Sequence, residues 1–459
     1  MRETKRQLSL YSFYDHTGIE AHLGRMAERG WLLCGLGQLL WHYRRIEPRQ
    51  ITFSVCYFPQ ATIYDPRPSE KQEEFYDLCA HAGWTLAGES GQLQVFYHEG
   101  EDPTPIDTDP ALEVEAIHQS AKKTVLPANF LLLGVAVLNL GLFLWRFWDN
   151  PVLTLASGGT LLALVAYTLI LVNCTVELCA YFRWRGRARR AAERGEFLPT
   201  RSRVWLQRLL LAVLLPAGAW WFAGMLRDGG GGLAAVSMLG VIGIIAAVLG
   251  VRKLLKGAGV SAKANLRGTL AACVVLSILF TAAIPWLVIR GLNSRPNPRP
   301  EELPLSVADL LEGDFSGYTR SWQGVQSPLL GRYTAYEWPL GPTGRFPDPV
   351  HLDYEVIQVK LPALYELCRE TKLHERDDWG GNPEDFWYGY AYAPVDPAPW
   401  GAEEVYQWLP GDGTDKEADN NQYLLFYPDR VVEISLQWDQ PPTPEQMAAV
   451  GEKLGRGPL

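Results

Sequence analysis

Five apolar runs in the middle of the chain constrain its fold more than any other feature. A helix needs about 20 mostly apolar residues to cross the hydrocarbon core of a bilayer. The runs cover residues 127–145, 152–180, 204–225, 233–251 and 269–288. Only helices satisfy their own backbone hydrogen bonds in lipid, and these runs lack the polar stripes of buried soluble helices. The sequence therefore predicts a membrane α-helical protein with about five transmembrane helices and the lipid bilayer as partner.

Charge is segregated along the chain in a way that fits this prediction. Residues 1–123 hold 12 Lys and Arg against 18 Asp and Glu, residues 124–291 hold 17 against 5, and residues 292–459 hold 13 against 28. A basic, apolar middle between acidic ends is typical of a bilayer-embedded region with solvated termini. We expect an α+β domain at 1–123, the transmembrane region at 124–291, a Pro- and Arg-rich linker at 292–304 and a second α+β domain at 305–459. Acidic ends make nucleic acid a poor partner.

The basic connections between the runs predict the orientation of the chain. The second connection carries Arg183, Arg185, Arg187, Arg189 and Arg190, and the fourth carries Arg252, Lys253, Lys256, Lys263 and Arg267. The first and third connections are short and almost neutral. Lys and Arg near helix ends are retained on the cytoplasmic side. We therefore expect a multi-pass protein of the cell membrane with a cytoplasmic N-terminus and, after five crossings, an extracytoplasmic C-terminus. The polar start of the chain is not a cleavable signal, so the first helix would serve as an uncleaved one.

The first domain contains an internal duplication. Residues 23–45 and 76–98 each place a helical stretch before Gly-Trp-x-Leu, then a short loop ending in Gly-Gln-Leu, then an aromatic strand. The shared positions are Gly30 and Trp31 in the first copy and Gly83 and Trp84 in the second. Glycine suits the left-handed residue that follows a helix, so the glycines should end the helices and the tryptophans should pack back on the core.

Further signals in this domain predict a ferredoxin-like sandwich. Thr17 with Glu20, and Ser69 with Gln72, have the spacing of a capping box at a helix start. Alternating strands are expected at residues 7–13 and 51–58. Together with the duplicated elements they give the order βαββαβ, which is typical of that fold.

The same residues resemble a known family. The motifs are Phe-Tyr-Asp at 13–15, Met-Ala-x-x-Gly-Trp at 26–31, Tyr-Arg at 43–44 and Ala-Gly-Trp at 82–84. They are similar to a family of bacterial membrane proteins named only for an N-terminal domain of unknown function. Its members are often encoded beside PadR-like transcriptional regulators, so the resemblance implies a regulated membrane or envelope role. It implies no catalytic residues.

The C-terminal domain has several well-marked elements. Strands are expected at 422–427 and 431–438, joined at Pro428-Asp429, and a strand leading into a helix is expected at 352–369. Thr443, Pro444 and Gln446 predict the start of a terminal helix. The stretch 377–412 is rich in aromatic residues and proline. It is either the core of a small domain or a groove for peptide or glycan, and the core is the more common use of such residues.

No motif indicates catalysis, a cofactor or a metal. The seven cysteines include no CxxC pair, and Cys368 alone is expected outside, where it has no disulfide partner. His16 and His22 do not share a helix face and are interpreted as surface histidines. A solvated loop is favoured over a calcium site for Asp412, Asp415, Glu417 and Asp419. Dinucleotide, phosphate-loop and nucleophile-elbow motifs are missing.

Glu177 is the one acid inside an apolar run. Ionisable groups at membrane depth are functional candidates by default, which makes Glu177 an intramembrane candidate. It lies close to the basic connection, however, and extension of its side chain toward Arg183 or Arg185 is the favoured interpretation.

The architecture favours a membrane-bound regulatory or sensory protein that couples an extracytoplasmic domain to a cytoplasmic one, and that is not an enzyme. The alternative is an accessory or permease-like subunit of an export system, with a protein partner in the membrane or cytoplasm. A third hypothesis, an envelope enzyme using Asp377, Asp378 or Asp385, has the weakest basis, since no catalytic constellation surrounds these carboxylates.

Overall fold

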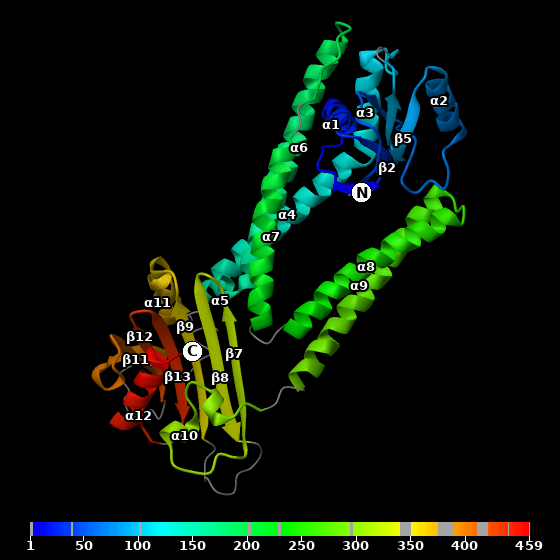
Figure 1. Cartoon of the computed structure of the whole chain (residues 1–459). Helices are drawn as coiled ribbons and strands as arrows, with labels where there is room; N and C mark the ends of the chain where they lie inside the picture. Colours follow the sequence, from blue (N-terminus) through cyan, green and yellow to red (C-terminus); the bar gives the residue numbers. More distant parts are fainter. Residues whose placement is uncertain are drawn as a thin grey trace, which may run out of the picture. The chain divides into compact units, whose positions relative to one another are not determined.

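The computed structural model describes most of the chain (Figure 1). The described ranges are 3–37, 40–100, 103–200, 203–227, 231–293, 297–339, 350–374, 390–410, 421–438 and 440–458. The chain divides into two compact units. The first contains Met1–Asn139 and Ala166–Arg290, and the second contains Leu140–Val165 and Gly291–Leu459.

The N-terminal domain is a βαββ unit that occurs twice. The first copy consists of β1 (Thr4–Leu8), α1 (His16–Glu28), β2 (Trp31–Leu36) and β3 (Leu40–Arg45). The second consists of β4 (Thr52–Tyr57), α2 (Glu70–His81), β5 (Thr85–Ser90) and β6 (Leu93–His98). Each copy forms a three-stranded antiparallel sheet, with order β1-β3-β2 in one and β4-β6-β5 in the other. The duplication seen in the sequence is therefore a duplication of the fold.

The expected βαββαβ order of a ferredoxin-like sandwich is not confirmed. The described structure has two further strands, β2 and β5, and two three-stranded sheets in place of one larger sheet. Both strands carry a bulge at the same place in the repeat, between Leu33 and Gly35 in β2 and between Leu86 and Gly88 in β5. A bulge interrupts the two-residue alternation by which a strand is recognised in a sequence. β1 also ends at Leu8, before most of the stretch expected to be extended.

The two repeated glycines end their helices as predicted. Gly30 and Gly83 follow α1 and α2 with φ of 77° and 87°, in the left-handed region. The two tryptophans differ in burial. Trp84 is buried and its indole Nε1 donates to the carbonyl of Thr104 at 2.9 Å. Trp31 is half-buried, and Lys5 and Arg45 lie 5.7 and 5.0 Å from its ring centre.

One of the two predicted helix starts is displaced. Ser69 is the N-cap of α2, although in the described structure its side chain forms no capping bond. α1 begins earlier than expected, because Asp15 is its N-cap and accepts from the backbone N–H of Gly18 at 3.2 Å. Thr17 consequently lies inside the helix.

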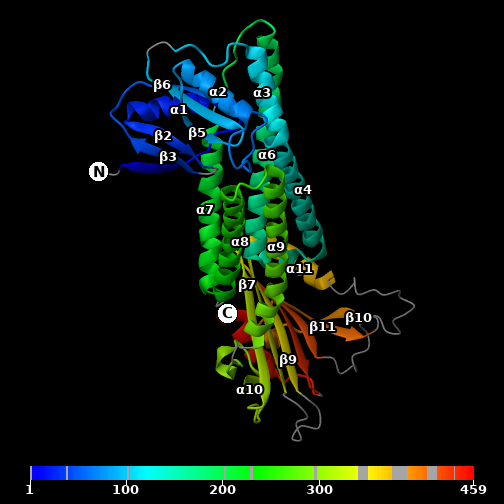
Figure 2. The same ribbon diagram turned by 90° about the vertical axis from the view of Figure 1, so that its right-hand side faces the viewer.

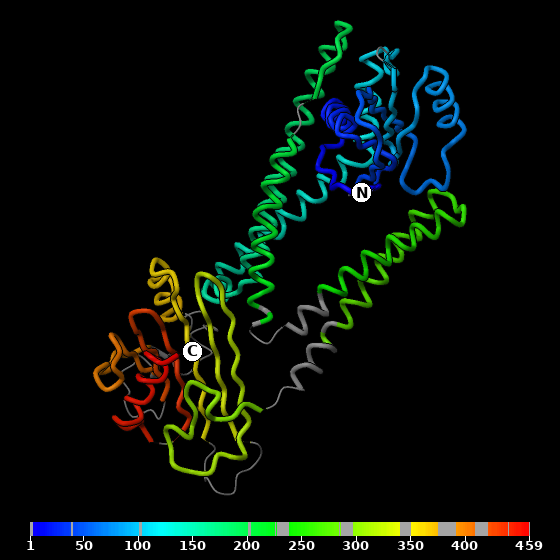
Figure 3. The backbone as a smooth tube through the Cα atoms, in the orientation of Figure 1, coloured from blue at the N-terminus to red at the C-terminus, as the bar shows by residue number. Residues whose placement is uncertain are grey.

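Within the described residues, five helices are long and apolar enough to cross a membrane, as expected of a multi-pass membrane protein. They are α4 (Val125–Asp149), α6 (Gly158–Ala192), α7 (Val204–Arg227), α8 (Gly231–Gly257) and α9 (Ala262–Asn293). α3 (Pro110–Lys123) precedes them, and α5 (Pro151–Ala156) lies between α4 and α6. α8 and α9 run side by side in opposite directions (Figures 2 and 3).

The second apolar run, expected at 152–180, differs from a single span at both ends. Its first residues form the short helix α5, which Asn150 caps by accepting from the backbone N–H of Leu153 at 2.9 Å. α6 then continues beyond residue 180 as far as Ala192. The five arginines predicted in a connecting loop therefore lie on a helix.

The C-terminal unit is built on an antiparallel sheet, which has seven strands in the described residues. Its order is β10-β11-β12-β13-β9-β8-β7. The strands are β7 (Tyr318–Gln326), β8 (Leu330–Pro339), β9 (His351–Val359), β10 (Tyr390–Val395), β11 (Glu404–Pro410), β12 (Gln422–Tyr427) and β13 (Arg430–Gln437). Alternate residues of β13 enter different cores: Val432 packs with α10 (Val307–Leu310) and α12 (Pro444–Val450), and Val431 with α5 and α11 (Tyr365–His374).

The expected elements of this domain are present. β12 and β13 form the hairpin, β9 leads into α11, and the Thr443 and Gln446 side chains each accept from the other's backbone N–H at the start of α12. The β7–β8 hairpin was not predicted. Trp400, in the aromatic stretch, is buried in the core. Seven acidic residues considered as carboxylate or calcium-site candidates lie outside the described residues: Asp377, Asp378, Asp385, Asp412, Asp415, Glu417 and Asp419.

Candidate functional site: a buried cluster of carboxyl and imidazole groups

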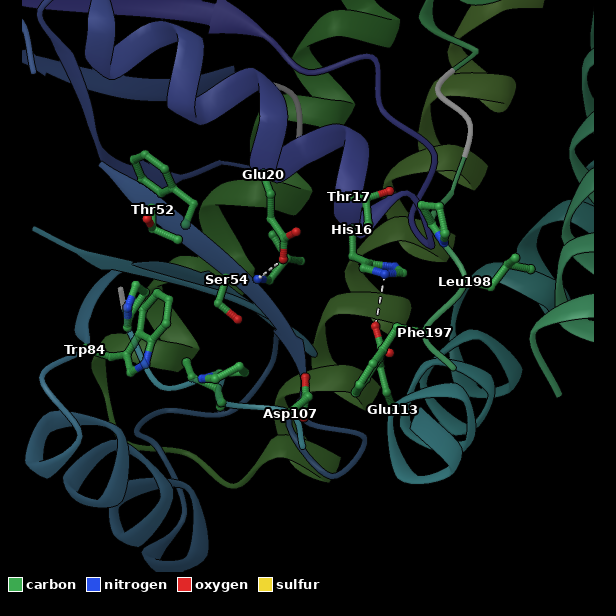
Figure 4. A pocket seen from close by; sticks show the side chains of 16 residues that line it. His16, Thr17, Glu20, Thr52, Ser54, Trp84, Asp107, Glu113, Phe197 and Leu198 are labelled. Carbon is green, nitrogen blue, oxygen red and sulfur yellow. Dashed lines mark hydrogen bonds and ion pairs between the residues drawn. The ribbon is translucent and has the colours of Figure 1, made fainter. Parts of the chain in front are cut away.

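A cavity of about 370 Å³ lies in the first unit and is lined by titratable side chains (Figure 4). Its walls come from the first turns of α1, from β4, from the segment before α3 and from the loop after α6. His16 and Glu20 stand four residues apart on α1, which places both on one face of the helix. Both point toward the cavity in Figure 4.

His16 forms an ion pair with Glu113 of α3. Its Nε2 lies 2.9 Å from Glu113 Oε1, and the side chains are only 9% and 13% exposed. The other ring nitrogen, Nδ1, lies 3.3 Å from the carbonyl oxygen of Tyr14. Burial alone would lower the pKa of His16, but the hydrogen bond and charge of Glu113 raise it above the usual value of 6.5. The imidazole is thereby held toward its charged form.

Two further carboxyl groups share this cavity. Glu20 Oε1 accepts from the backbone N–H of Val55 at 2.9 Å, and burial raises the pKa of Glu20 to about 7. Burial, followed by the charge of Glu113, also raises the pKa of Asp107. With a pKa of about 7, Glu20 exchanges protons near neutral pH beside an imidazole that is held toward its charged form, and proton exchange is the chemistry this arrangement supports.

The loop after α6 closes one side of the cavity and is fastened to the start of α1. Phe197, Leu198 and Pro199 line the cavity wall. The Thr200 hydroxyl donates to Asp15 Oδ1 at 2.5 Å, and the Thr200 backbone N–H donates to Thr17 Oγ1 at 2.9 Å. These bonds link α6, through its following loop, to the helix that carries His16 and Glu20.

Thiol chemistry is not supported near this cluster. Cys56 of β4 is buried, and burial raises the pKa of its thiol well above the usual value. A thiolate is the reactive form of cysteine, so Cys56 is held in its inert form. Across the described ranges, no group of three or more His, Cys, Asp or Glu residues could hold a metal ion.

Glu177, the candidate from the sequence, lies in a different part of the first unit. The Ser12 hydroxyl donates to Glu177 Oε1 at 2.8 Å. In the described structure, no ion pair links Glu177 to Arg183 or Arg185, the partners expected for an extended side chain. Glu177 therefore contacts the N-terminal domain.

The five arginines of α6 are arranged around an apolar face of the helix. Trp184 and Ala188 are buried in the core of the N-terminal domain, together with Tyr181. Most of the arginine side chains are exposed and Arg185 is half-buried. This part of α6 is amphipathic and belongs structurally to the N-terminal domain.

The interpretation of His16 and His22 as surface histidines is wrong. His16 is buried in the cluster, and His22 is half-buried beside the Tyr43 hydroxyl at 3.3 Å. Burial and nearby cations lower the pKa of His22 to about 4. The signal in the sequence was the four-residue spacing of His16 and Glu20, but nothing local placed Glu113 beside them.

The described fold combines an α+β domain at the N-terminus, five helices long and apolar enough to cross a membrane, and a β-rich domain at the C-terminus, which is the architecture expected of a multi-pass membrane protein. Residues 15–128, about a quarter of the chain, match a family model described as "Protein of unknown function (DUF2812)". The matched region contains His16, Glu20, Asp107 and Glu113. No curated protein and no solved structure matches the chain.

Proposed function

We propose that this protein is a membrane-bound regulatory or sensory protein, in which an extracytoplasmic C-terminal domain is coupled to a cytoplasmic N-terminal domain. The observation that carries the proposal is that α6 begins in one compact unit and ends in the other. Its 35 residues extend over about 52 Å at a rise of roughly 1.5 Å per residue, well beyond the ~30 Å of a hydrocarbon core.

Both ends of α6 adjoin a hydrophobic core. In the first unit, Leu178, Tyr181 and Trp184 of α6 are buried with residues of α1 and its sheet. In the second unit, Val152 and Ala156 of α5, which leads directly into α6, are buried against the C-terminal sheet. A helix anchored at both ends can transmit a rotation or shift from one domain to the other.

The cluster around His16 is placed to respond to a rotation or shift of α6. The cavity wall at 197–199 directly follows α6, and Thr200 is bonded to the start of α1. A displacement of α6 would therefore alter the environment of His16 and of Glu20, whose pKa is about 7. The matched family has no stated activity, so the proposal rests on this geometry.

The orientation in this proposal is tested by thiol labelling in intact cells. Cys368 is unsuitable because it is fully buried and burial raises the pKa of its thiol to about 11. We would remove the exposed Cys34, Cys179 and Cys273, then restore Cys34 alone or introduce Glu312→Cys at an exposed position. A membrane-impermeant maleimide should label Glu312→Cys in intact cells and Cys34 only after permeabilisation. Labelling of both positions from the same side would contradict the prediction that the chain crosses the membrane an odd number of times.

The coupling is tested by hydrogen exchange on the full chain in nanodiscs. Leu155→Ala removes buried contacts between α5 and the C-terminal sheet. Leu454→Ala, in the segment after α12, removes buried contacts on the opposite side of the same sheet. We expect Leu155→Ala to change exchange in α1 and in residues 103–113 by severalfold, and Leu454→Ala to leave it unchanged. Equal effects of both substitutions on the N-terminal domain would refute coupling through α5 and α6.

A further inference from the structure

A second cavity, of about 530 Å³, lies within the first unit, between loops of the N-terminal domain and the end of α8. Leu249, Arg252, Lys253 and Lys256 line it from α8. Their spacing of three, four and seven residues places them on one face of the helix. The opposite wall contains Arg67, which brings the number of Lys and Arg side chains around the cavity to four.

The two acidic side chains that line this cavity, Asp65 and Glu89, accept hydrogen bonds from neutral donors. Asp65 Oδ2 accepts from the backbone N–H of Thr62 at 2.6 Å. Glu89 Oε2 accepts from Gln72 Nε2 at 3.1 Å and from the Tyr76 hydroxyl. Among the residues that the structure describes, neither carboxylate pairs with the four basic side chains, and those four form no ion pair with any other group.

A buried amide links the parts of the chain that form the two walls of the cavity. Asn265, at the start of α9, is fully buried, and its Nδ2 donates to the carbonyl of Tyr64 at 3.1 Å and to that of Arg252 at 3.4 Å. Tyr64 precedes the stretch that carries Asp65 and Arg67. The amide therefore connects this loop of the N-terminal domain to α9 and to Arg252 of α8.

We propose that this cavity binds a phosphorylated anion, with phosphoryl oxygens accepting hydrogen bonds from Arg252, Lys253 and Lys256 on one wall and from Arg67 on the other. The four cations outnumber the two carboxylates that line the cavity and leave a net positive charge that an anion would neutralise, and guanidinium and ammonium groups bind phosphate strongly. The volume is that of a small-molecule site. The cavity adjoins the end of a candidate membrane span, where headgroups of anionic lipids are also found.

The binding chemistry is the same for a lipid headgroup and for a soluble phosphate compound, and the test separates them. Full-length protein in detergent is mixed with phosphatidylglycerol and analysed by native mass spectrometry. Full-length protein in phosphatidylcholine nanodiscs is titrated with inorganic pyrophosphate by calorimetry. We expect specific binding in one of these two arms, which identifies the source of the phosphate.

Two matched double variants decide whether the cavity is responsible. Arg252→Gln with Lys256→Gln removes two cavity cations, and Lys263→Gln with Arg267→Gln removes two exposed cations from the start of α9 outside the cavity. The first pair should weaken binding at least tenfold, and the second less than twofold. Because both pairs lower the charge of the α8–α9 hairpin equally, an equal loss would indicate general electrostatic attraction and would overturn the proposal.

A third variant acts from the opposite wall. Arg67→Gln lies in the N-terminal domain and should weaken binding as the Arg252→Gln with Lys256→Gln variant does. Its unfolding temperature should equal that of the wild type. Failure of the wild-type protein to bind in either arm, or unchanged binding by Arg67→Gln, would also overturn the proposal. Binding at this cavity does not depend on coupling through α5 and α6, so each can fail without the other.

Discussion

Two residues of the first unit, His16 and Glu20, both have a raised pKa in the folded protein. Burial alone would lower the pKa of His16, but Glu113 raises it, and burial raises the pKa of Glu20 from 4.5 to about 7. In both cases the folded protein holds a proton that the unfolded chain releases at lower pH. The stability from Glu20 is therefore lost as the pH rises from about 4.5 to 7, and that from His16 as it rises above about 6.5.

This linkage predicts that the N-terminal domain becomes less stable between pH 5 and pH 8. Glu20→Gln keeps a side-chain oxygen for the Val55 N–H but cannot ionise, so the decline between pH 5 and 7 should become much shallower. The midpoint of thermal unfolding would be followed with a fluorophore on Cys34, in protein lacking Cys179 and Cys273. Equal slopes for the wild type and the variant would contradict this assignment.

The ion pair itself can be tested with a matched control on the same helix. Glu113→Ala leaves the imidazole of His16 buried without its partner and should destabilise the domain by about 3 kcal/mol. Glu115→Ala removes an exposed carboxylate one half-turn away and should cost less than about 0.5 kcal/mol. Both values are measured by denaturant unfolding with the Cys34 fluorophore. Similar losses for the two variants would show that the pair contributes little.

At the scale of elements, the two copies of the βαββ unit meet at their bulges. An added Cβ at Gly88 would lie 3.2 Å from Gly35 Cα and from Leu36 N, whereas one at Gly35 would meet nothing closer than His42 Cβ at 3.8 Å. β2 and β5 are therefore side by side, and the close approach is limited by Gly88. The equivalent positions of the repeat are not equally tolerant of a side chain.

This asymmetry predicts different costs for the same substitution. Gly88→Ala should destabilise the domain by about 1 to 3 kcal/mol, because backbone must move to accept the methyl group. Gly35→Ala should cost less than about 1 kcal/mol, since only ordinary contacts form. Hydrogen exchange of β5 and β6 in the full chain measures both. A greater loss for Gly35→Ala would show that Gly88 does not limit the approach of the two copies.

Elements with local signals could be predicted from the sequence, and elements defined by distant contacts could not. Gly30 and Gly83 marked two helix ends, and Thr443 with Gln446 marked the start of α12, since each acts on its own neighbours. β2 and β5 were not predicted because their bulges break the alternation of apolar and polar residues. The His16 cluster was not predicted because Glu113 is far from His16 in the chain.

At the scale of the whole molecule, hydropathy was sufficient to locate the five helices that are long and apolar enough to cross a membrane, because crossing lipid requires a minimum length and an apolar composition. It was not sufficient to divide the chain. The end of α4, all of α5 and the start of α6 belong to the C-terminal unit, and α5 was taken as part of a span. Its length of six residues and its contacts with the C-terminal sheet distinguish it from a membrane segment.

The orientation of the molecule should depend on the arginines of α6. Replacing Arg183, Arg185, Arg187, Arg189 and Arg190 by glutamine removes most of the positive charge next to the second span, so a fraction of molecules should insert inverted. Replacing the same five by lysine keeps the charge and should keep the orientation. The Cys34 and Glu312→Cys labelling assay measures both variants. Unchanged labelling in the glutamine variant would assign the orientation to other residues.

The meeting of equivalent bulges in β2 and β5 also bears on the origin of the domain. When Gly35 of one copy lies against Gly88 of the other, the contact joins a position to its own repeat-mate, as in an isologous dimer. A chain with a single βαββ unit would carry that self-complementary edge exposed and would pair with a second copy. Fusion of two such genes turns an association that depends on concentration into one that is permanent, and it frees each half to diverge.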